Sequence, residues 1–260
     1  MSFIDWLYSS YPNPSINGQW GWLHIVTLVL CIGIIIAISL IFNKCQKLNN
    51  PKAKKIVLWV AFGLILFFEL ARRIINLCKT TEFTFNGVLH TLLPRPWCAI
   101  SCWVLMASVI VNKKFFYNFA SITSLLCTLI FFAYPGVGFN NELILFENLY
   151  SIVTHSLLLI TSICMITLGF TDFRYKTAWK ELICLVLVFI YAILEIYVLK
   201  IEDDPLYFMR GNDVQEIFGV GYGAFLAIYI VFMVIYTNAF YLIQDRKFVF
   251  SKFKRKKELK

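Results

Sequence analysis

Residues 23–42 read LHIVTLVLCIGIIIAISLIF, a run without a single Asp, Glu, Lys or Arg. An α-helix rises about 1.5 Å per residue, so a run of this length matches the hydrocarbon core of a bilayer, which is about 30 Å thick. A stretch this long and this apolar predicts a transmembrane helix rather than the buried helix of a soluble protein.

Similar runs continue along the chain, which has 260 residues, of which 60% are hydrophobic and only 15% are charged. Soluble domains are about half apolar and a quarter charged. The sequence therefore predicts an all-α polytopic membrane protein with seven transmembrane helices in one membrane domain, residues 1–260. It excludes a soluble enzyme, a nucleic-acid-binding domain and a disulfide-stapled secreted fold. The predicted spans are Leu23–Phe42, Ile56–Leu77, Trp97–Val111, Phe115–Tyr134, Leu149–Phe170, Leu182–Leu199 and Phe218–Leu242.

The positive charges predict the orientation of these spans. With the N-terminus outside, 18 of the 24 Lys and Arg residues lie on the cytoplasmic side, with five in Lys44–Lys55 and eight in Arg246–Lys260. Cytoplasmic loops of membrane proteins carry such an excess. We therefore expect a short outer N-terminus (1–22), a basic cytoplasmic tail (244–260) and a multi-pass protein of the plasma membrane. The clusters favour contact with anionic lipid headgroups over nucleic acid.

The third span is unusual because it is short. Trp97–Val111 follows the residues LLPRP at 92–96. Proline is common at the first position of a helix. Two prolines predict an abrupt start from a loop that dips into the membrane, where non-helical backbone must be buried in protein or line a wet cavity.

Ionisable residues within the spans are costly, so each is a candidate functional residue. Under the predicted orientation they fall in the outer half of the bilayer, and the inner half holds almost nothing comparable. This distribution predicts a polar cavity open to the outer leaflet. The candidates are His24, Glu69, Arg72, Arg73, Cys98, His155 and Glu195.

Each charged candidate also has a structural interpretation. Glu69 precedes Arg72 and Arg73 by three and four residues, which is the spacing of a local ion pair on a helix. The same arginine pair is suited to hold a substrate phosphate. Glu195 could reach the interface instead of lining a cavity, and His24 could be a polar group at the membrane surface.

Cys98 and His155 form a candidate nucleophile and base. A thiol nucleophile needs a base within hydrogen-bond reach. The two residues belong to different spans but are expected at a similar depth, and a helix start favours the thiolate at Cys98. The alternative is that the cysteine simply packs, as buried cysteines usually do.

Several of these residues resemble a known family. Leu93–Ser101, which reads LPRPWCAIS, resembles the LP-x-x-x-C-x-x-S motif of the YwaF-like family of seven-span bacterial membrane proteins. Gly21–His24 is similar to the histidine motif of that family's first span. Glu69 with Arg72 resembles the charged pair of the second span, and Ile152–His155 resembles the histidine motif of the fifth.

The resemblance continues at Tyr134–Gly136, which is similar to the proline that closes the family's fourth span, and at Asp204–Leu206. The family is related to a eukaryotic transmembrane acyltransferase that works on ether phospholipids. The resemblance implies that Cys98 carries an acyl group as a thioester and that His155 assists as the general base.

The sequence thus leads to one main hypothesis and two alternatives. The main hypothesis is a phospholipid acyltransferase or transacylase whose substrates are membrane lipids, with no metal or nucleotide cofactor implied. Substrate would be held by His24, Glu69, Arg72, Arg73 and Glu195. The alternatives are a non-enzymatic protein that binds or transports a small polar solute, and a membrane scaffold. The oligomeric state is left open.

Overall fold

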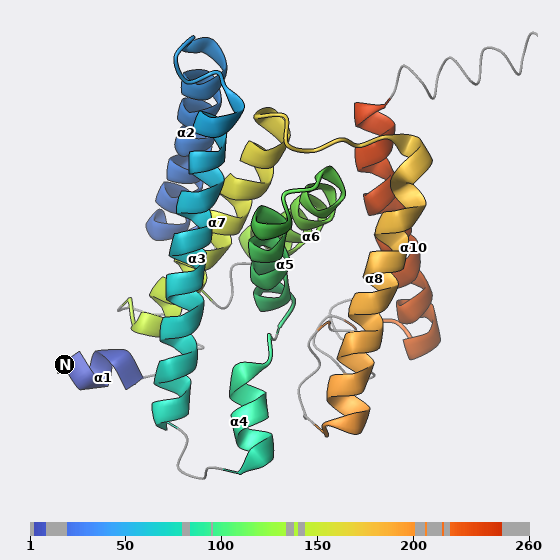
Figure 1. Ribbon diagram of the computed structural model, residues 1–260. Coiled ribbons are helices and arrows are strands. Elements are labelled where there is room, and N and C mark those ends of the chain that lie inside the picture. Colours follow the sequence, from blue (N-terminus) through green and yellow to red (C-terminus); the bar gives the residue numbers. More distant parts are fainter. Residues whose placement is uncertain are drawn as a thin grey trace, which may run out of the picture. The chain divides into compact units, whose positions relative to one another are not determined.

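The structure, a computed structural model, describes residues 3–8, 20–79, 84–94, 96–133, 138–139, 144–200, 206, 215 and 219–245. Every regular element in these ranges is a helix (Figure 1). The chain divides into two compact units, residues 1–171 and 172–260, and each is described here by itself. Arg95, Tyr134–Gly136, Asp204-Pro205 and the basic tail from residue 246 lie outside the described residues.

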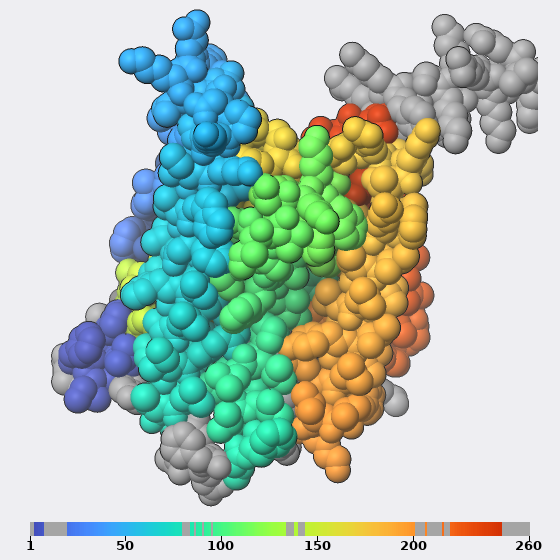
Figure 2. Space-filling view, in the orientation of Figure 1, coloured from blue at the N-terminus to red at the C-terminus, as the bar shows by residue number. Residues whose placement is uncertain are grey.

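The first unit is built around α6. Helix α6 packs against α5 on one side and α7 on the other, α7 also contacts α2 and α3, and α3 contacts α4 and α5. Figure 2 shows α3, α4 and α5 side by side along one face of this unit. Its helices are α1 (Phe3–Tyr8), α2 (Trp22–Lys44), α3 (Pro51–Lys79), α4 (Phe85–Leu92), α5 (Trp97–Val111), α6 (Lys114–Ala133) and α7 (Phe146–Thr167).

The second unit contains two long helical segments. A short 3₁₀ turn, η1 (Tyr175–Thr177), leads into α8 (Ala178–Ile193), which continues as a π-helical turn, η2 (Leu194–Val198). Helix α10 (Tyr222–Gln244) packs against α8 and contacts η1.

Five of the described helical segments are long and apolar enough to cross a membrane: α2, α6, α7, Tyr175–Val198 and α10. Helix α5 is apolar but has only 15 residues, and it begins and ends where the sequence predicted the third span. Helix α3 has 29 residues and carries charges at both ends. The predicted class, an all-α polytopic membrane protein, is confirmed. The single domain over residues 1–260 stays a prediction.

Helices α2 and α6 differ in how much of their apolar stretch is buried within the protein. In the most apolar 18-residue stretch of α2, 11% is buried, whereas 78% of the most apolar 18-residue stretch of α6 is buried. A helix that is apolar all round and largely uncovered is suited to contact lipid. Helix α6 instead buries small polar residues such as Ser121, Ser124 and Thr128, which let helices approach closely in a membrane.

The helix ends in the first unit follow local sequence signals. Helix α3 begins at Pro51, and the Asn50 side chain caps it by accepting a hydrogen bond from the Ala53 N–H at 2.9 Å. Helix α7 ends at Thr167 and is followed by its C-cap Leu168 and then by Gly169, whose φ is +82°. The Phe170 N–H then donates to the Met165 carbonyl at 2.9 Å, which completes a Schellman motif.

We expect Gly169→Ala to lower the free energy of unfolding by about 1 kcal/mol, because an L-residue is strained at positive φ. No atom lies within 4 Å of a Cβ built at this position, so crowding adds nothing to the effect. Thermal unfolding of the purified protein in detergent measures the change. Gly33→Ala is the matched control: its Cβ also meets open space, but its φ is ordinary, and alanine favours the helix interior. Equal destabilisation by the two variants would contradict the prediction.

Candidate functional site

The centre of the candidate site is Glu69, whose carboxylate is fully buried within the apolar helix α3. Its Oε2 forms an ion pair with the Nη2 of Arg73 at 3.1 Å. Its Oε1 accepts a hydrogen bond from the hydroxyl of Tyr150 on α7. A buried carboxylate is tolerated only when it is paired and hydrogen-bonded, and both oxygens are satisfied here.

Arg73 also fixes the end of α4 against α3. Its Nη1 donates to the carbonyl oxygens of Thr91 at 3.0 Å and Leu93 at 3.2 Å, and to that of Leu92. Carbonyls at the end of a helix lack partners within the helix and favour a cation nearby. Arg73 and Glu69 therefore form one of the local ion pairs that the spacing allowed, and Arg73 also holds the end of α4 against α3.

Arg72 points to a different neighbour. Its Nη1 donates to the Tyr150 hydroxyl at 3.0 Å, and its guanidinium carbon lies 5.0 Å from the centre of the Tyr150 ring. Arg72 also lies within electrostatic range of Cys98. Of the two arginines, Arg72 is thus the one placed next to the candidate nucleophile.

Cys98 is the second residue of α5 and is partly exposed. The backbone amides of Cys98 and Ala99 are close enough to interact with its sulfur. The Ala99 N–H also donates to the Pro96 carbonyl at 2.9 Å, and the positive end of the helix dipole favours negative charge. The preceding residue, Trp97, is buried, and its indole N–H donates to the Thr123 carbonyl of α6 at 3.2 Å. This bond anchors the start of α5 and with it the thiol.

His155 is held in one tautomer on α7. Its Nδ1 lies 2.7 Å from the carbonyl oxygen of Ser151. A carbonyl only accepts, so Nδ1 carries the proton in the neutral ring and Nε2 has the free lone pair. The ring stacks on Phe131 with centroids 3.7 Å apart. In the described part of the chain, no hydrogen bond joins His155 to Cys98, so a direct pair between them stays a prediction.

His24, which is fully buried at the start of α2, lies among aromatic rings. Its ring centroid is 5.0 Å from that of Phe139 and 5.3 Å from that of Trp20. The Trp20 backbone N–H lies 3.3 Å from Nδ1, and Nε2 has no hydrogen-bond partner among the described residues. His24 is thus a buried polar group and not an exposed polar tip at the membrane surface.

Two buried glutamates belong to the second unit. Glu195 accepts a hydrogen bond from Tyr191 at 2.7 Å, one helical turn away. Glu181, in the first turn of α8, is also fully buried and accepts from Tyr241 of α10 at 2.7 Å. The sequence placed Glu181 just outside a span, so its burial was missed.

The structure thus groups Glu69, Arg72 and Arg73 within the first unit, with Cys98 in electrostatic range of Glu69 and Arg72, and sets His24 and His155 against aromatic rings. Tyr150, which links Glu69 to Arg72, was missed by sequence reasoning. Tyrosine is common at membrane interfaces, so its position gave no distinct signal. Among the described residues, no group of three His, Cys, Asp or Glu could hold a metal ion.

Apolar helices around a buried polar cluster define a polytopic membrane protein with an intramembrane polar site. Comparison with known families refines this class. The model of the TMEM164 family matches residues 19–245, and the chain belongs to this family. Searches of the curated proteins and of the solved structures found no match.

We expect Tyr150→Phe to lower the free energy of unfolding by about 1 to 3 kcal/mol, because it leaves a buried carboxylate oxygen without a donor. Tyr150→Phe should lower the free energy of unfolding by less in the Glu69→Gln variant, since a neutral amide is less costly to leave unpaired. A double-mutant cycle measured by unfolding in detergent gives the coupling between the two residues. Additive effects would show that the hydroxyl does not stabilise the carboxylate.

Proposed function

We propose that this integral membrane protein of the TMEM164 family is a phospholipid acyltransferase that works through a thioester on Cys98. The observation that carries the proposal is the position of Cys98, a partly exposed residue at the N-terminus of α5 whose thiol lies within electrostatic range of Arg72. The resemblance to the YwaF-like family and to the eukaryotic ether-phospholipid acyltransferase points to the same residue.

In the first step, the Cys98 sulfur attacks the carbonyl carbon of a phospholipid ester. The thiol proton passes to Nε2 of His155, directly or through one water, and then to the departing alkoxide. The C–S bond forms as the C–O ester bond breaks, which leaves an acyl-thioester and a lysolipid. The Cys98 amide in the first turn of α5 is suited to stabilise the oxyanion that develops on the carbonyl, since the Ala99 and Ile100 amides donate to the Pro96 carbonyl.

In the second step, the hydroxyl of an acceptor lysolipid attacks the thioester. Its proton returns through His155 to the sulfur, so the thiol is regenerated and no external reductant or energy source is needed. Arg72 is placed to hold a lipid phosphate, because a guanidinium binds phosphate oxygens in pairs. Glu69 and Arg73 position Arg72 through Tyr150, while His24 and Glu195 remain proposed substrate contacts.

The proposal includes the full topology: seven spans, the N-terminus outside, the C-terminus in the cytoplasm and the plasma membrane as location. Helices α3 and α5 supply the two spans beyond the five that are long and apolar enough. The ends of α3 and α7 that carry Arg72 and Tyr150 would then face the outer leaflet.

We expect the purified protein in lipid nanodiscs to transfer an isotope-labelled acyl chain from phospholipid to lysolipid. Cys98→Ala should abolish transfer, and mass spectrometry of the wild type should find an acyl adduct on Cys98. Cys102→Ala is the matched control, because Cys102 is a buried thiol one turn further along α5. It should retain transfer.

Other outcomes distinguish the alternatives. Absence of both transfer and adduct across several acyl donors would overturn the enzyme proposal. A solute carrier would keep solute binding in Cys98→Ala, and a scaffold would tolerate both Cys98→Ala and His155→Ala. Loss of transfer in Cys102→Ala as well as Cys98→Ala would indicate a packing effect.

The orientation has its own test in two exposed cysteines near opposite ends of the same helix. Cys45 directly follows α2, in the segment that leads into α3, and Cys78 lies next to the last residue of α3. We expect a membrane-impermeant maleimide to label intact cells on Cys78, so that Cys78→Ala removes the label and Cys45→Ala does not. Labelling of Cys45 in intact cells would reverse the topology.

A further inference from the structure

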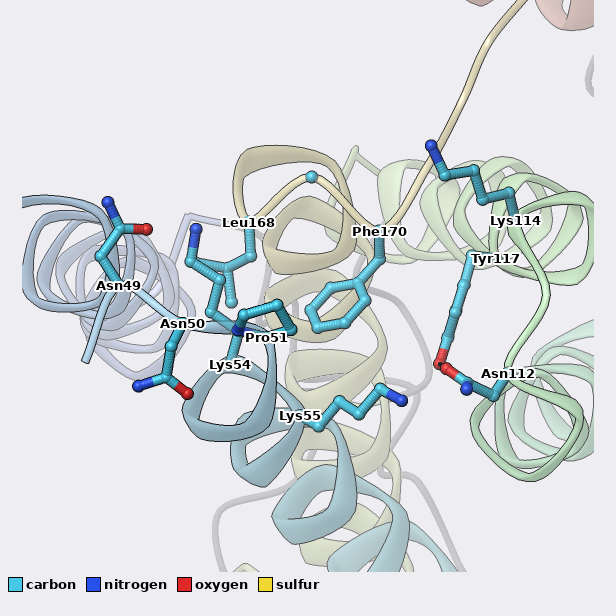
Figure 3. A pocket seen from close by; sticks show the side chains of 11 residues that line it. Asn49, Asn50, Pro51, Lys54, Lys55, Asn112, Lys114, Tyr117, Leu168 and Phe170 are labelled. Atoms are coloured by element: carbon cyan, nitrogen blue, oxygen red, sulfur yellow. Dashed lines mark hydrogen bonds between the residues drawn. The ribbon is translucent and has the colours of Figure 1, made fainter. Parts of the chain in front are cut away.

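A pocket of about 440 Å³ lies at the end of the first unit where α3 and α6 begin. Figure 3 shows Lys55 of α3 extending toward Asn112 and Tyr117, whereas the Lys54 side chain extends toward the opposite side, and the Phe170 ring lies between Lys54 and Tyr117. Lys114 completes a set of three lysines, and none of the lining residues is acidic. The described lining residues therefore carry a net positive charge.

Local backbone structure builds its walls. Asn112 ends α5 in the left-handed conformation and accepts a hydrogen bond from the Tyr117 hydroxyl at 3.1 Å. The Schellman motif at Gly169 turns Phe170 back, and its ring centroid lies 5.4 Å from that of Tyr117. Since two helix caps and a side-chain hydrogen bond set these positions, the pocket is formed without a ligand.

The polar groups in the pocket favour an anion. Lys54 donates to the Asn43 side-chain oxygen at 2.9 Å, and this neutral partner leaves the lysine charge uncompensated. Helices α3 and α6 begin at this pocket and helices α5 and α7 end there, so their dipoles offset one another and the positive charge comes from the lysines. Ammonium groups bind phosphate as point charges.

The volume limits the size of that anion. A water occupies about 30 Å³ of liquid, so the pocket is roughly fifteen waters in size. This leaves room for a phosphate together with the organic group that carries it, beside the rings of Tyr117 and Phe170. Pockets of about 300 to 1,000 Å³ are typical of small-molecule sites.

We propose that this pocket binds a phosphate ester, carried either by a lipid headgroup or by a water-soluble molecule. Lys54 and Glu69 are separated along α3 by about 22 Å at 1.5 Å per residue. The pocket is therefore a second site, separate from the residues of the proposed acyl transfer. Under the proposed topology it opens toward the cytoplasm.

Two arms of one experiment distinguish the sources of the ester. In the first, the full-length protein in phosphatidylcholine nanodiscs is exposed to increasing phosphatidic acid, and native mass spectrometry counts the retained lipid. In the second, glycerol phosphate is titrated into the protein in phosphatidylcholine alone, and the shift in Tm is followed. Binding in the first arm alone identifies a lipid headgroup, and binding in the second identifies a soluble ester.

Charge removal tests the site itself. Lys54→Gln, Lys55→Gln and Lys114→Gln together should weaken binding on the order of a hundredfold, because each lysine near a membrane surface is worth about fivefold. The matched control is Lys44→Gln, Lys47→Gln and Lys52→Gln, which removes the same charge from the same end of the unit but does not alter the pocket lining. The control should bind like the wild type.

Two outcomes would overturn the proposal: no binding of either ester by the wild type, or equal weakening by both triple variants, which would indicate diffuse surface attraction. If the pocket triple variant fails to fold, the single variants decide. Lys55→Gln should weaken binding about fivefold, Lys55→Arg should restore it, and Lys52→Gln should not change it. Wild-type affinity in a folded Lys55→Gln would also overturn the proposal.

Discussion

The buried carboxylate of Glu69 is the constraint on which the first unit depends. A carboxylate removed from water is costly by several kcal/mol unless the protein returns the lost hydrogen bonds. Tyr150 returns one from α7, and Arg73 supplies the opposite charge from α3 itself. Arg73 also holds the end of α4, so one acidic side chain fixes the relative positions of α3, α4 and α7.

Arg72 and Arg73 make different contacts because consecutive residues on a helix point in different directions. Arg73 is buried, is paired with Glu69 and caps α4. Arg72 stacks on Tyr150 and lies near the thiol. A single arginine could not both stabilise the carboxylate and contact a lipid phosphate, so the proposed function requires both arginines.

How far the sequence predicts this arrangement depends on whether a feature is local. The abrupt start of α5 followed from the prolines before Trp97, and the Glu69–Arg73 pair is one of the two local ion pairs that the spacing allowed. The partners Tyr150 of Glu69 and Phe131 of His155 lie on other helices. Their selection depends on how the helices pack, which periodicity does not encode.

The burial of Glu181 escaped the sequence for the same reason. It lies in the first turn of α8, at the edge of an apolar run, where a carboxylate is ordinarily exposed. Among the described residues, the Tyr241 hydroxyl of α10 donates to one of its oxygens and the other oxygen has no partner. The sequence around Glu181 does not predict that its partner is Tyr241, sixty residues further along the chain.

The short α5 also links the proposed chemistry to the lipid around it. Its 15 residues extend about 22 Å, less than the roughly 30 Å of hydrocarbon in a typical bilayer. If its far end reaches one surface, Cys98 lies several ångströms below the other, deeper than the ester groups of the lipids. A bilayer thinned around α5 would bring ester and sulfur together, and a sterol-rich one would hold them apart. On this view, the thickness of the surrounding membrane regulates access to the thiol.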